Sequence, residues 1–409
     1  MLDGLLASRR SERPRLVTGT FVLITLATFA YFLSVGMLLP TLPRYVKGPL
    51  GGESLAVGIV VGAFAVSAVL LRPFVGGLGD RRGRRVLMVG GAAVVAGSVA
   101  LYSVAASVWP MVLLRLVTGI GEAAFYVGAA SAINDLAPDE RRGEALSYFS
   151  LALYSGLAVG PVLGELVLES RDFTATWLVA GAAAALATII GSRVPETRPQ
   201  GMGPGELTRG GIIHRAGLMP GTILATQIWG LSAFSAFIPL YALDVGLSGS
   251  RGVFATYSVV VLLIRSLGAR IPDILGPRRA ATTALTTSAA ALTLMGLWSE
   301  PAGLFVGAFI FGIGQALAFP ALMSLAVSGA PATERGAVIG TFTAFFDLSF
   351  GLGAVASGGI AAVLDYQGAF VGAAAVAFGG MLLMRFYDGR ARRSEDVAVD
   401  EQDERLGSV

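Results

Sequence analysis

Long apolar runs separated by short polar segments make up most of the chain, and each run is close to the length that a helix needs to cross a bilayer. A spanning helix takes ~20 residues, whereas a strand of a membrane barrel takes ~9–11 residues of alternating polarity. The runs here do not alternate in that way. The pattern therefore predicts an all-α polytopic membrane protein with twelve transmembrane helices. The runs lie at 17–42, 55–77, 86–107, 110–134, 143–168, 174–192, 218–243, 252–271, 279–298, 302–328, 337–362 and 367–386.

Composition supports a lipid environment and narrows the chemistry. Charged residues make up 14% of the 409 residues and hydrophobic residues 54%, whereas soluble domains carry ~25% charged residues. Cysteine is absent and His214 is the only histidine. Disulfides, Cys/His metal sites and cysteine nucleophiles are therefore excluded, and we expect no metal, no cofactor and no enzymatic activity.

Positive charges are distributed unevenly between the loops. Of the 30 Arg and Lys residues, 23 lie in one set of alternate loops and termini, 4 lie in the other set and 3 lie within runs. Because basic residues favour the cytoplasmic side, both termini are predicted to be cytoplasmic in a bacterial-type cell membrane. The basic residues are spread between apolar runs instead of forming one patch, so nucleic acid is not an expected partner.

The two halves of the chain resemble each other at a fixed offset of 193 residues. Paired six-helix repeats place a substrate site near the bilayer midplane between the halves, with alternating access by rocking. The alternative is a chance recurrence of common loop residues. The offset relates Arg72 to Arg265, Asp80 to Asp273, Gly83 to Gly276, Pro138 to Pro331, Gly143 to Gly336, and the segment 119–122 to 312–315.

The runs and the repeat together predict the segment boundaries. The prolines and glycines between the halves indicate a linker, and the acidic composition after the last run indicates disorder. The predicted segments are a cytoplasmic N-terminal segment at 1–16, a six-helix bundle at 17–192, a cytoplasmic linker at 193–217, a second six-helix bundle at 218–386 and a disordered cytoplasmic tail at 387–409.

The loop after the second run carries the most specific motif. Residues 76–85 read Gly-Gly-Leu-Gly-Asp-Arg-Arg-Gly-Arg-Arg, which resembles the G-x-L-x-D-R-x-G-R-R loop of the major facilitator superfamily. Arg115-x-x-x-Gly119 in the fourth run resembles a second element of that family, and Gly119 is a candidate for helix packing. The resemblance covers about 17–386 and implies a secondary transporter built from two pseudo-symmetric six-helix bundles.

A glycine motif in the fifth run resembles the element associated with proton antiporters. Gly156, Gly160, Pro161 and Gly164 follow its spacing, and the glycines share one helix face, where a neighbouring backbone can approach closely. Ordinary tight packing is the alternative role. Glu165 stands where the family pattern usually has a second glycine. We expect this carboxylate near the outer end of the run, within reach of water, as a proton-coupling candidate.

We expect the motif loop to act as a conformational latch. Asp80 can face the start of the eleventh run, at 336–339, because a helix N-terminus carries partial positive charge and unpaired N–H groups. By the repeat, Asp273 would face the start of the fifth run at 143–146. Alternatively, the loop is a solvated turn whose arginines serve topology or contact anionic lipid. The latch candidates are Gly76, Asp80, Arg81, Gly83, Arg84, Arg85, Asp273 and Gly276.

Ionisable residues inside the runs are candidates for proton coupling, because they are costly in lipid and usually face a cavity. Glu122 and Asp347 both fall ~15–18 Å into their runs, near the midplane. Arg115 shares a helix face with Glu122 and is expected to attract anionic groups. The alternatives are a permanent pair of Arg115 with Glu122, and a helix–helix hydrogen bond of Asp347 near Ser349.

The resemblance also implies a cavity lined by aromatic residues. An aromatic, sparsely charged lining favours an amphipathic or lipophilic substrate over a sugar, and lipid-facing positions are the alternative for some of these residues. Arg72 and Arg265 are expected to snorkel to the cytoplasmic interface instead. The cavity-lining candidates are Tyr31, Phe32, Tyr126, Tyr154, Trp229, Phe234, Phe237, Gln315 and Phe346.

These observations favour a proton-coupled exporter resembling the twelve-span drug:proton antiporter branch of the superfamily. The alternative is a proton-coupled importer of a small metabolite with the same fold. A membrane enzyme or a non-transporting sensor is disfavoured by the absent cysteine, the absence of histidine from the runs and the short loops. The expected partners are a small-molecule substrate, protons and membrane lipids, and we expect a monomer.

Overall fold

The regular structure of the chain is helical throughout the described residues. The computed structural model describes residues 16–138, 141–198, 213–267, 274–331 and 334–407. The main elements are α2 (Gly19–Lys47), α3 (Ser54–Arg82), α4 (Arg84–Ala100), η1 (Leu101–Val104), α5 (Val108–Leu136), α6 (Arg142–Ser170), α7 (Phe173–Ser192), α8 (Arg215–Asp244), α9 (Arg251–Leu267), α11 (Pro277–Leu297), α12 (Pro301–Ser328) and α13 (Arg335–Gly407).

The all-α prediction is confirmed, and each predicted run falls on a helix. Ten segments of the described chain are long and apolar enough to cross a membrane. The last of them, Ala337–Tyr387, contains two helices, because Leu364 and Asp365 have non-helical backbone angles. The predicted run at 252–271 corresponds to α9, which has 17 residues before the described segment ends. The described chain therefore accounts for the twelve runs.

Local sequence explains where several helices begin. The Thr18 hydroxyl accepts a hydrogen bond from the N–H of Phe21 and caps α2, and Asp172 caps α7 in the same way. Pro277 and Pro301 occupy the first turn of α11 and α12, where a missing N–H is harmless. These caps let helices follow one another across short loops.

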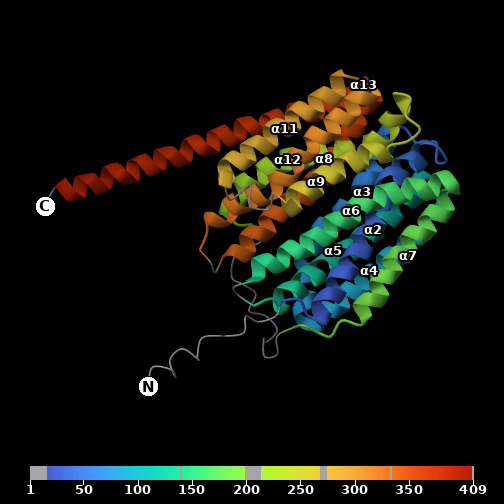
Figure 1. Ribbon diagram of the computed structural model, residues 1–409, viewed down its shortest axis with the longest axis horizontal. Coiled ribbons are helices and arrows are strands. Elements are labelled where there is room, and N and C mark those ends of the chain that lie inside the picture. Colours follow the sequence, from blue (N-terminus) through green and yellow to red (C-terminus); the bar gives the residue numbers. More distant parts are fainter. Residues whose placement is uncertain (1–15, 139–140, 199–212, 268–273, 332–333, 408–409) are drawn as a thin grey trace.

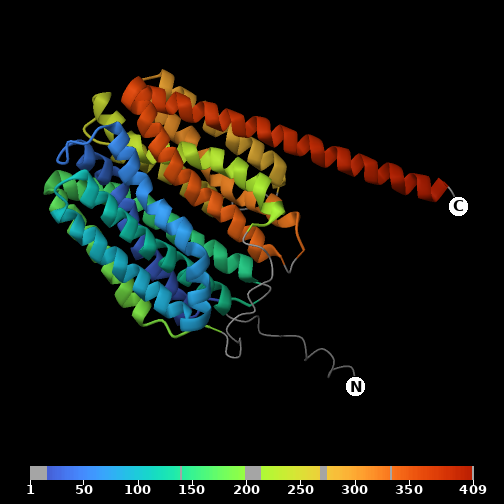
Figure 2. The same cartoon turned by 180° about the vertical axis from the view of Figure 1, so that it is seen from behind.

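The helices form two bundles, α2 to α7 and α8 to α13, that lie side by side in both views (Figures 1 and 2). Between the bundles, α3 packs on α13 and α9 packs on α6. The offset found in the sequence relates α3 to α9 and α6 to the first part of α13, so these two interfaces are one contact made twice. The repeat seen in the sequence is therefore a repeat of packing.

The bundles are in close contact at one end and separated at the other. We call the end that holds Ser54 and Glu165 the closed end, and the end that holds the loop 76–85 the open end. At Gly62, near the closed end, an added Cβ would lie 2.6 Å from the Gly351 carbonyl oxygen of the other bundle. At Gly76 and Gly340, near the open end, an added Cβ would have no neighbour within 4 Å among the described residues.

The segment after the last run differs from its prediction. We expected a disordered tail at 387–409, but α13 continues to Gly407 and extends beyond the bundle (Figure 1). Residues 390–406 contain neither proline nor glycine and are rich in Arg and Glu. These residue types have high helix propensity, so a polar composition does not by itself interrupt the helix.

Candidate functional site

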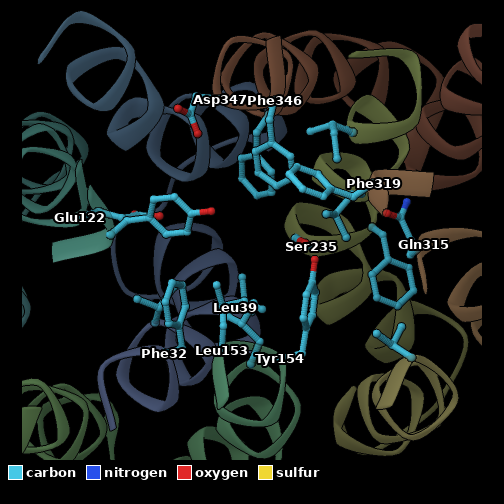
Figure 3. Close-up of a pocket in the computed structure, with 18 of the residues that line it drawn as sticks. Phe32, Leu39, Glu122, Leu153, Tyr154, Ser235, Gln315, Phe319, Phe346 and Asp347 are labelled. Atoms are coloured by element: carbon cyan, nitrogen blue, oxygen red, sulfur yellow. The ribbon is translucent and has the colours of Figure 1, made fainter. Parts of the chain in front are cut away.

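A cavity of about 260 Å³ lies between the two bundles, and its wall is mainly apolar. Aliphatic and aromatic side chains from α2, α3, α5, α6, α8, α9, α12 and α13 contribute to the wall. Figure 3 shows the labelled residues around this space, with Glu122 and Gln315 on opposite sides. The charged and amide side chains of the wall are Arg72, Arg115, Glu122, Arg265, Gln315 and Asp347.

Asp347 is buried in this wall and pairs with an arginine of the other bundle. Its Oδ2 lies 2.7 Å from a terminal nitrogen of Arg72, and Asp347 is 6% exposed. The approach is close but is not aligned as a hydrogen bond, which leaves Oδ2 without a hydrogen-bond donor among the described residues. The expected snorkelling of Arg72 to the membrane interface is therefore wrong, because its guanidinium pairs with a carboxylate in the cavity wall instead.

Arg265 makes the equivalent contact on the opposite side of the cavity. Its guanidinium donates a hydrogen bond of 3.0 Å to the hydroxyl of Tyr154 and lies 3.7 Å from the centre of that ring. The repeat takes Arg72 to Arg265, and the same offset takes Tyr154 to Asp347. The two contacts are therefore related by the repeat, with a carboxylate in one and a phenol in the other. The snorkelling expected of Arg265 is also wrong.

Glu122 lies in the cavity wall without an ion-pair partner among the described residues. The alternative of a permanent Arg115–Glu122 pair is wrong, because Arg115 binds elsewhere. Arg115 donates hydrogen bonds of 3.1 Å to the carbonyls of Val60 and Val61 and stacks 4.7 Å from the ring centre of Phe64. Arg115 therefore joins α5 to α3, and the Glu122 carboxylate faces the cavity.

The aromatic candidates divide into two groups. Tyr31 and Phe237 are fully buried inside their own bundles, and Trp229 packs against Gly353 of α13. Tyr31 stacks on Phe125, with ring centres 3.9 Å apart. Packing inside their own bundle keeps these three side chains out of the cavity wall, contrary to expectation. The candidates that line the cavity are Phe32, Tyr126, Tyr154, Phe234, Gln315 and Phe346.

We expected Glu165 to be within reach of water, but this prediction is wrong. It is fully buried at the closed end, where it accepts hydrogen bonds from the N–H and hydroxyl of Ser250 and from the N–H of Arg251. The distances are 2.9, 2.6 and 2.6 Å, and Arg44 lies 3.7 Å away. Glu165 of α6 thus caps the N-terminus of α9 in the other bundle, because the closed end brings these two helix ends together.

Asp80 and Arg84 of the motif loop form ion pairs within their own bundle. Asp80 is exposed and pairs with Arg84 at 2.6 Å, and Arg84 also binds Asp135 at 3.2 Å. The expected contact of Asp80 with 336–339 is therefore not formed, because the bundles are separated at the open end. Asp273, its counterpart in the second half, lies outside the described residues. Gly276 precedes α11 with a φ of +77°, and Gly83 precedes α4 with a φ of +102°.

The linker contributes a contact that the sequence did not predict. The Glu196 carboxylate accepts hydrogen bonds from the N–H groups of Arg84, Arg85 and Arg198, at 2.9, 3.3 and 3.0 Å. Partial burial opposes ionisation, but the backbone donors outweigh it and lower the pKa of Glu196. An added Cβ at Gly83 would collide with this carboxylate. The loop 76–85 and the linker are thus held together.

The remaining candidates are at positions of close helix packing or at the loop surface. An added Cβ at Gly160 would lie 2.6 Å from the Cα of Gly36, and Gly156 and Gly164 approach α2 in the same way. Gly119 approaches Phe64 of α3. In the loop, the Arg81 carbonyl accepts a hydrogen bond of 2.8 Å from Arg198, and Arg85 donates one of 2.7 Å to Ser192. Pro161 lies inside α6.

Comparison with known proteins identifies the family. The sequence model of the Major Facilitator Superfamily matches residues 24–271 and 252–407. The chain belongs to this superfamily. A relative described as an uncharacterized MFS-type transporter of Salmonella typhimurium is 30% identical over 373 residues, which cover 88% of this chain and 94% of the relative. One from Burkholderia mallei is 27% identical over 384 residues, with coverages of 91% and 93%.

Solved structures of the superfamily share the fold. A bacterial homolog of the human lysosomal transporter Spinster superposes with a TM-score of 0.75 at 14% identity, over 90% of this chain and 96% of that chain. The human organic anion transporter TETRAN superposes with a TM-score of 0.68 at 20% identity, over 89% and 98%. This chain is therefore a multi-pass membrane transporter of the major facilitator superfamily, and the cavity between its bundles is its candidate substrate site.

Two arginines of this transporter's cavity could have been found from the sequence. Arg72 and Arg265 are repeat equivalents, and the same offset pairs Asp347 with Tyr154. Helices related by a pseudo-two-fold axis contact each other in reciprocal pairs. A contact from α3 to α13 therefore implies a contact from α9 to α6. Applying the offset to the partner residues as well as to the arginines would have predicted both contacts.

Proposed function

We propose that this transporter exports an amphipathic molecule from the cytoplasm by proton antiport, with Glu122 and Asp347 as the proton carriers. The observation that supports this proposal is the presence of both carboxylates in one aromatic cavity, on opposite bundles. A carboxylate without hydrogen-bond donors in an apolar wall can exchange a proton at low energetic cost. The apolar part of such a cargo would cover few polar groups of the cavity wall, so few hydrogen bonds would be lost on binding.

The Arg72–Asp347 pair offers a physical link between proton binding and rocking. Arg72 belongs to α3 of the first bundle and Asp347 to α13 of the second, 2.7 Å apart. Protonation of Asp347 removes the charge that attracts Arg72, so one attraction between the bundles weakens. A bound proton thus changes the relative stability of the two conformations, which is the requirement for coupling.

Glu122 differs from Asp347 because no arginine neutralises it in the conformation observed. Its repeat equivalent is Gln315, an uncharged residue of the same shape. Glu122 therefore supplies an ionisable group at a position where the second bundle has a permanently neutral one. A substrate that enters the cavity excludes water from this carboxylate and favours its protonation, so that cargo and proton affect one another.

Alternating access follows from the closed and open ends. The charge distribution of the loops supports a cytoplasmic position for the loop 76–85, and with it for the open end. The cavity is then loaded from the cytoplasm, and transport requires the contacts at the closed end to break while contacts form near Gly76 and Gly340. Rocking of two bundles around a fixed site produces this change.

The test uses purified transporter in proteoliposomes with an imposed pH gradient. We expect Glu122→Gln and Asp347→Asn each to abolish cargo-dependent proton flux, because neither amide can carry a proton. Glu53→Gln is the matched control, since Glu53 is an exposed carboxylate at the start of α3 without a side-chain capping bond. Full proton flux in both cavity variants would overturn the proposal. Cargo that moves down the imposed proton gradient, together with protons, would instead indicate an importer.

A further inference from the structure

We propose that the cargo is an amphipathic anion, and that Arg265 binds its acidic group. This inference rests on the proposed function in one respect, because it places the cargo in the cavity between the bundles. It goes further by assigning the charge of the cargo and the residue that recognises it. The argument starts from the two equivalent arginine contacts.

The repeat makes the partner of Arg265 directly comparable with the partner of Arg72. Arg72 approaches a carboxylate of the opposite bundle, Asp347, at 2.7 Å. Arg265 approaches the neutral hydroxyl of Tyr154 at 3.0 Å in the equivalent contact. The first contact neutralises its guanidinium, and the second leaves the positive charge of Arg265 uncompensated by a charged partner among the described residues.

The charges of the cavity wall lead to the same conclusion. Among the described residues, five charged side chains line the cavity, and with both carboxylates ionised the three arginines leave a net charge of +1. Arg115 donates to two backbone carbonyls of α3, which do not cancel its charge, but the Glu122 carboxylate lies on the same helix, α5. With Asp347 beside Arg72, we therefore assign the excess positive charge to Arg265, beside apolar and aromatic walls that solvate a cation poorly.

The geometry of Arg265 suits an acidic ligand. Its Nε is buried and has no hydrogen-bond partner among the residues that the structure describes. A guanidinium presents several N–H groups in a planar fork, which matches the two oxygens of a carboxylate or sulfonate. The Tyr154 ring stacks on one face of this guanidinium at 3.7 Å and holds its plane. The aromatic wall would take the hydrophobic part of the same ligand.

The test compares ligands that share one hydrophobic scaffold and differ in charge. The probes are naphthoate, naphthalenesulfonate, neutral naphthamide and the cation naphthylmethylammonium. Binding to the purified full-length transporter is measured by calorimetry and by the shift in thermal unfolding. We expect both anions to bind about tenfold or more tightly than naphthamide, as is typical of a charge-assisted contact. Equal binding of naphthoate and naphthamide would overturn the inference.

Variants then test whether Arg265 is responsible. Arg265→Gln should abolish the preference for anions, Arg265→Lys should keep part of it, and the exposed-site control Arg171→Gln should keep all of it. Tyr154→Asp places a carboxylate where the other side of the cavity has Asp347, so it should neutralise Arg265 and also abolish the preference. Tyr154→Phe should retain the preference for anions, which distinguishes an effect of the added charge from a loss of folding. An unchanged preference in Arg265→Gln would overturn the inference.

The two proposals can fail separately. If naphthamide exchanges for protons as well as naphthoate does and Arg265→Gln has no effect, proton antiport stands and the anion inference is wrong. If naphthoate binds through Arg265 but never exchanges for protons, the anion inference stands and proton antiport is wrong.

Discussion

Glu122 and Gln315 occupy equivalent positions in the two bundles but differ in one ionisable group. Asp347 and Tyr154 are also equivalent, with a carboxylate in one bundle and a larger phenol in the other. Glu122 and Gln315 have nearly the same size, whereas Tyr154 is much larger than Asp347. The carboxylate appears once in each pair, and the two carboxylates stand in different bundles. Single residues thus place charge at different positions in two bundles whose helix packing repeats.

Glu196 allows a prediction about pH at the scale of one residue. Its pKa is lowered in the folded protein, chiefly because backbone N–H groups bind the ionised form strongly enough to outweigh its partial burial. The resulting stabilisation is complete above the unfolded pKa of ~4.3 and is lost as the pH falls through the lower folded pKa. Glu196→Gln should therefore unfold at a lower temperature than wild type at neutral pH, and this difference should shrink in acid.

Thermal unfolding in detergent across a pH series measures this difference. Glu53→Gln is the control, because Glu53 precedes α3 without a side-chain capping bond. Its unfolding temperature should follow that of wild type at each pH. A difference between Glu196→Gln and wild type that stayed constant down to acidic pH would contradict the assignment of the stabilisation to the ionised carboxylate.

At the scale of elements, the cap that α6 provides to α9 should hold the closed end together. Glu165→Gln keeps the size of the side chain but removes the charge that faces three donors and the helix N-terminus. Loss of charge-assisted bonds costs ~1–3 kcal/mol, and ~1.4 kcal/mol is a tenfold shift in an equilibrium. We therefore expect Glu165→Gln to populate conformations open at this end about tenfold more than wild type does.

An introduced cysteine can report this opening, because the chain contains no cysteine of its own. Leu42→Cys lies in the cavity wall near the closed end. A membrane-impermeant maleimide added outside should label it faster when Glu165→Gln is also present. Glu53→Gln is the control, since Glu53 is exposed at the start of α3 and makes no side-chain capping bond. Equal labelling rates in wild type and Glu165→Gln would exclude a role of this cap in closure.

The sequence predicted helices well and contacts between helices poorly. Helix positions follow from apolar length, which depends only on neighbouring residues, and all runs fell on helices. The partner of Asp80 depends on how far the bundles have rocked, so a local argument placed it on 336–339 while the structure pairs it with Arg84. Glu165 was misplaced for the same reason, because its partners belong to the other bundle. Such contacts depend on the conformation of the transporter, and a single sequence encodes more than one conformation.

At the scale of the whole molecule, the two-bundle architecture could be predicted because the two halves of the chain share a sequence pattern. The fixed offset between the halves predicted two related bundles, and their interfaces α3–α13 and α6–α9 obey it. The net charge of the cavity could not be predicted from composition. It depends on whether Arg72 and Arg265 point to the interface or inwards, and this is decided by partners far away along the chain, Asp347 and Tyr154.

Export of an anion in exchange for a proton would make transport sensitive to membrane voltage. An anion leaving the cell and a proton entering it both move positive charge inward, so an interior-negative potential drives both steps. The gain is ~2.3 kcal/mol per charge for each ~100 mV. At equal pH on both sides, naphthoate transport by proteoliposomes should therefore accelerate when a potassium diffusion potential makes the cytoplasmic side negative, and slow when the potential is reversed. Movement of naphthoate and one proton in the same direction carries no net charge, so a rate independent of voltage would argue against exchange of the anion for a proton.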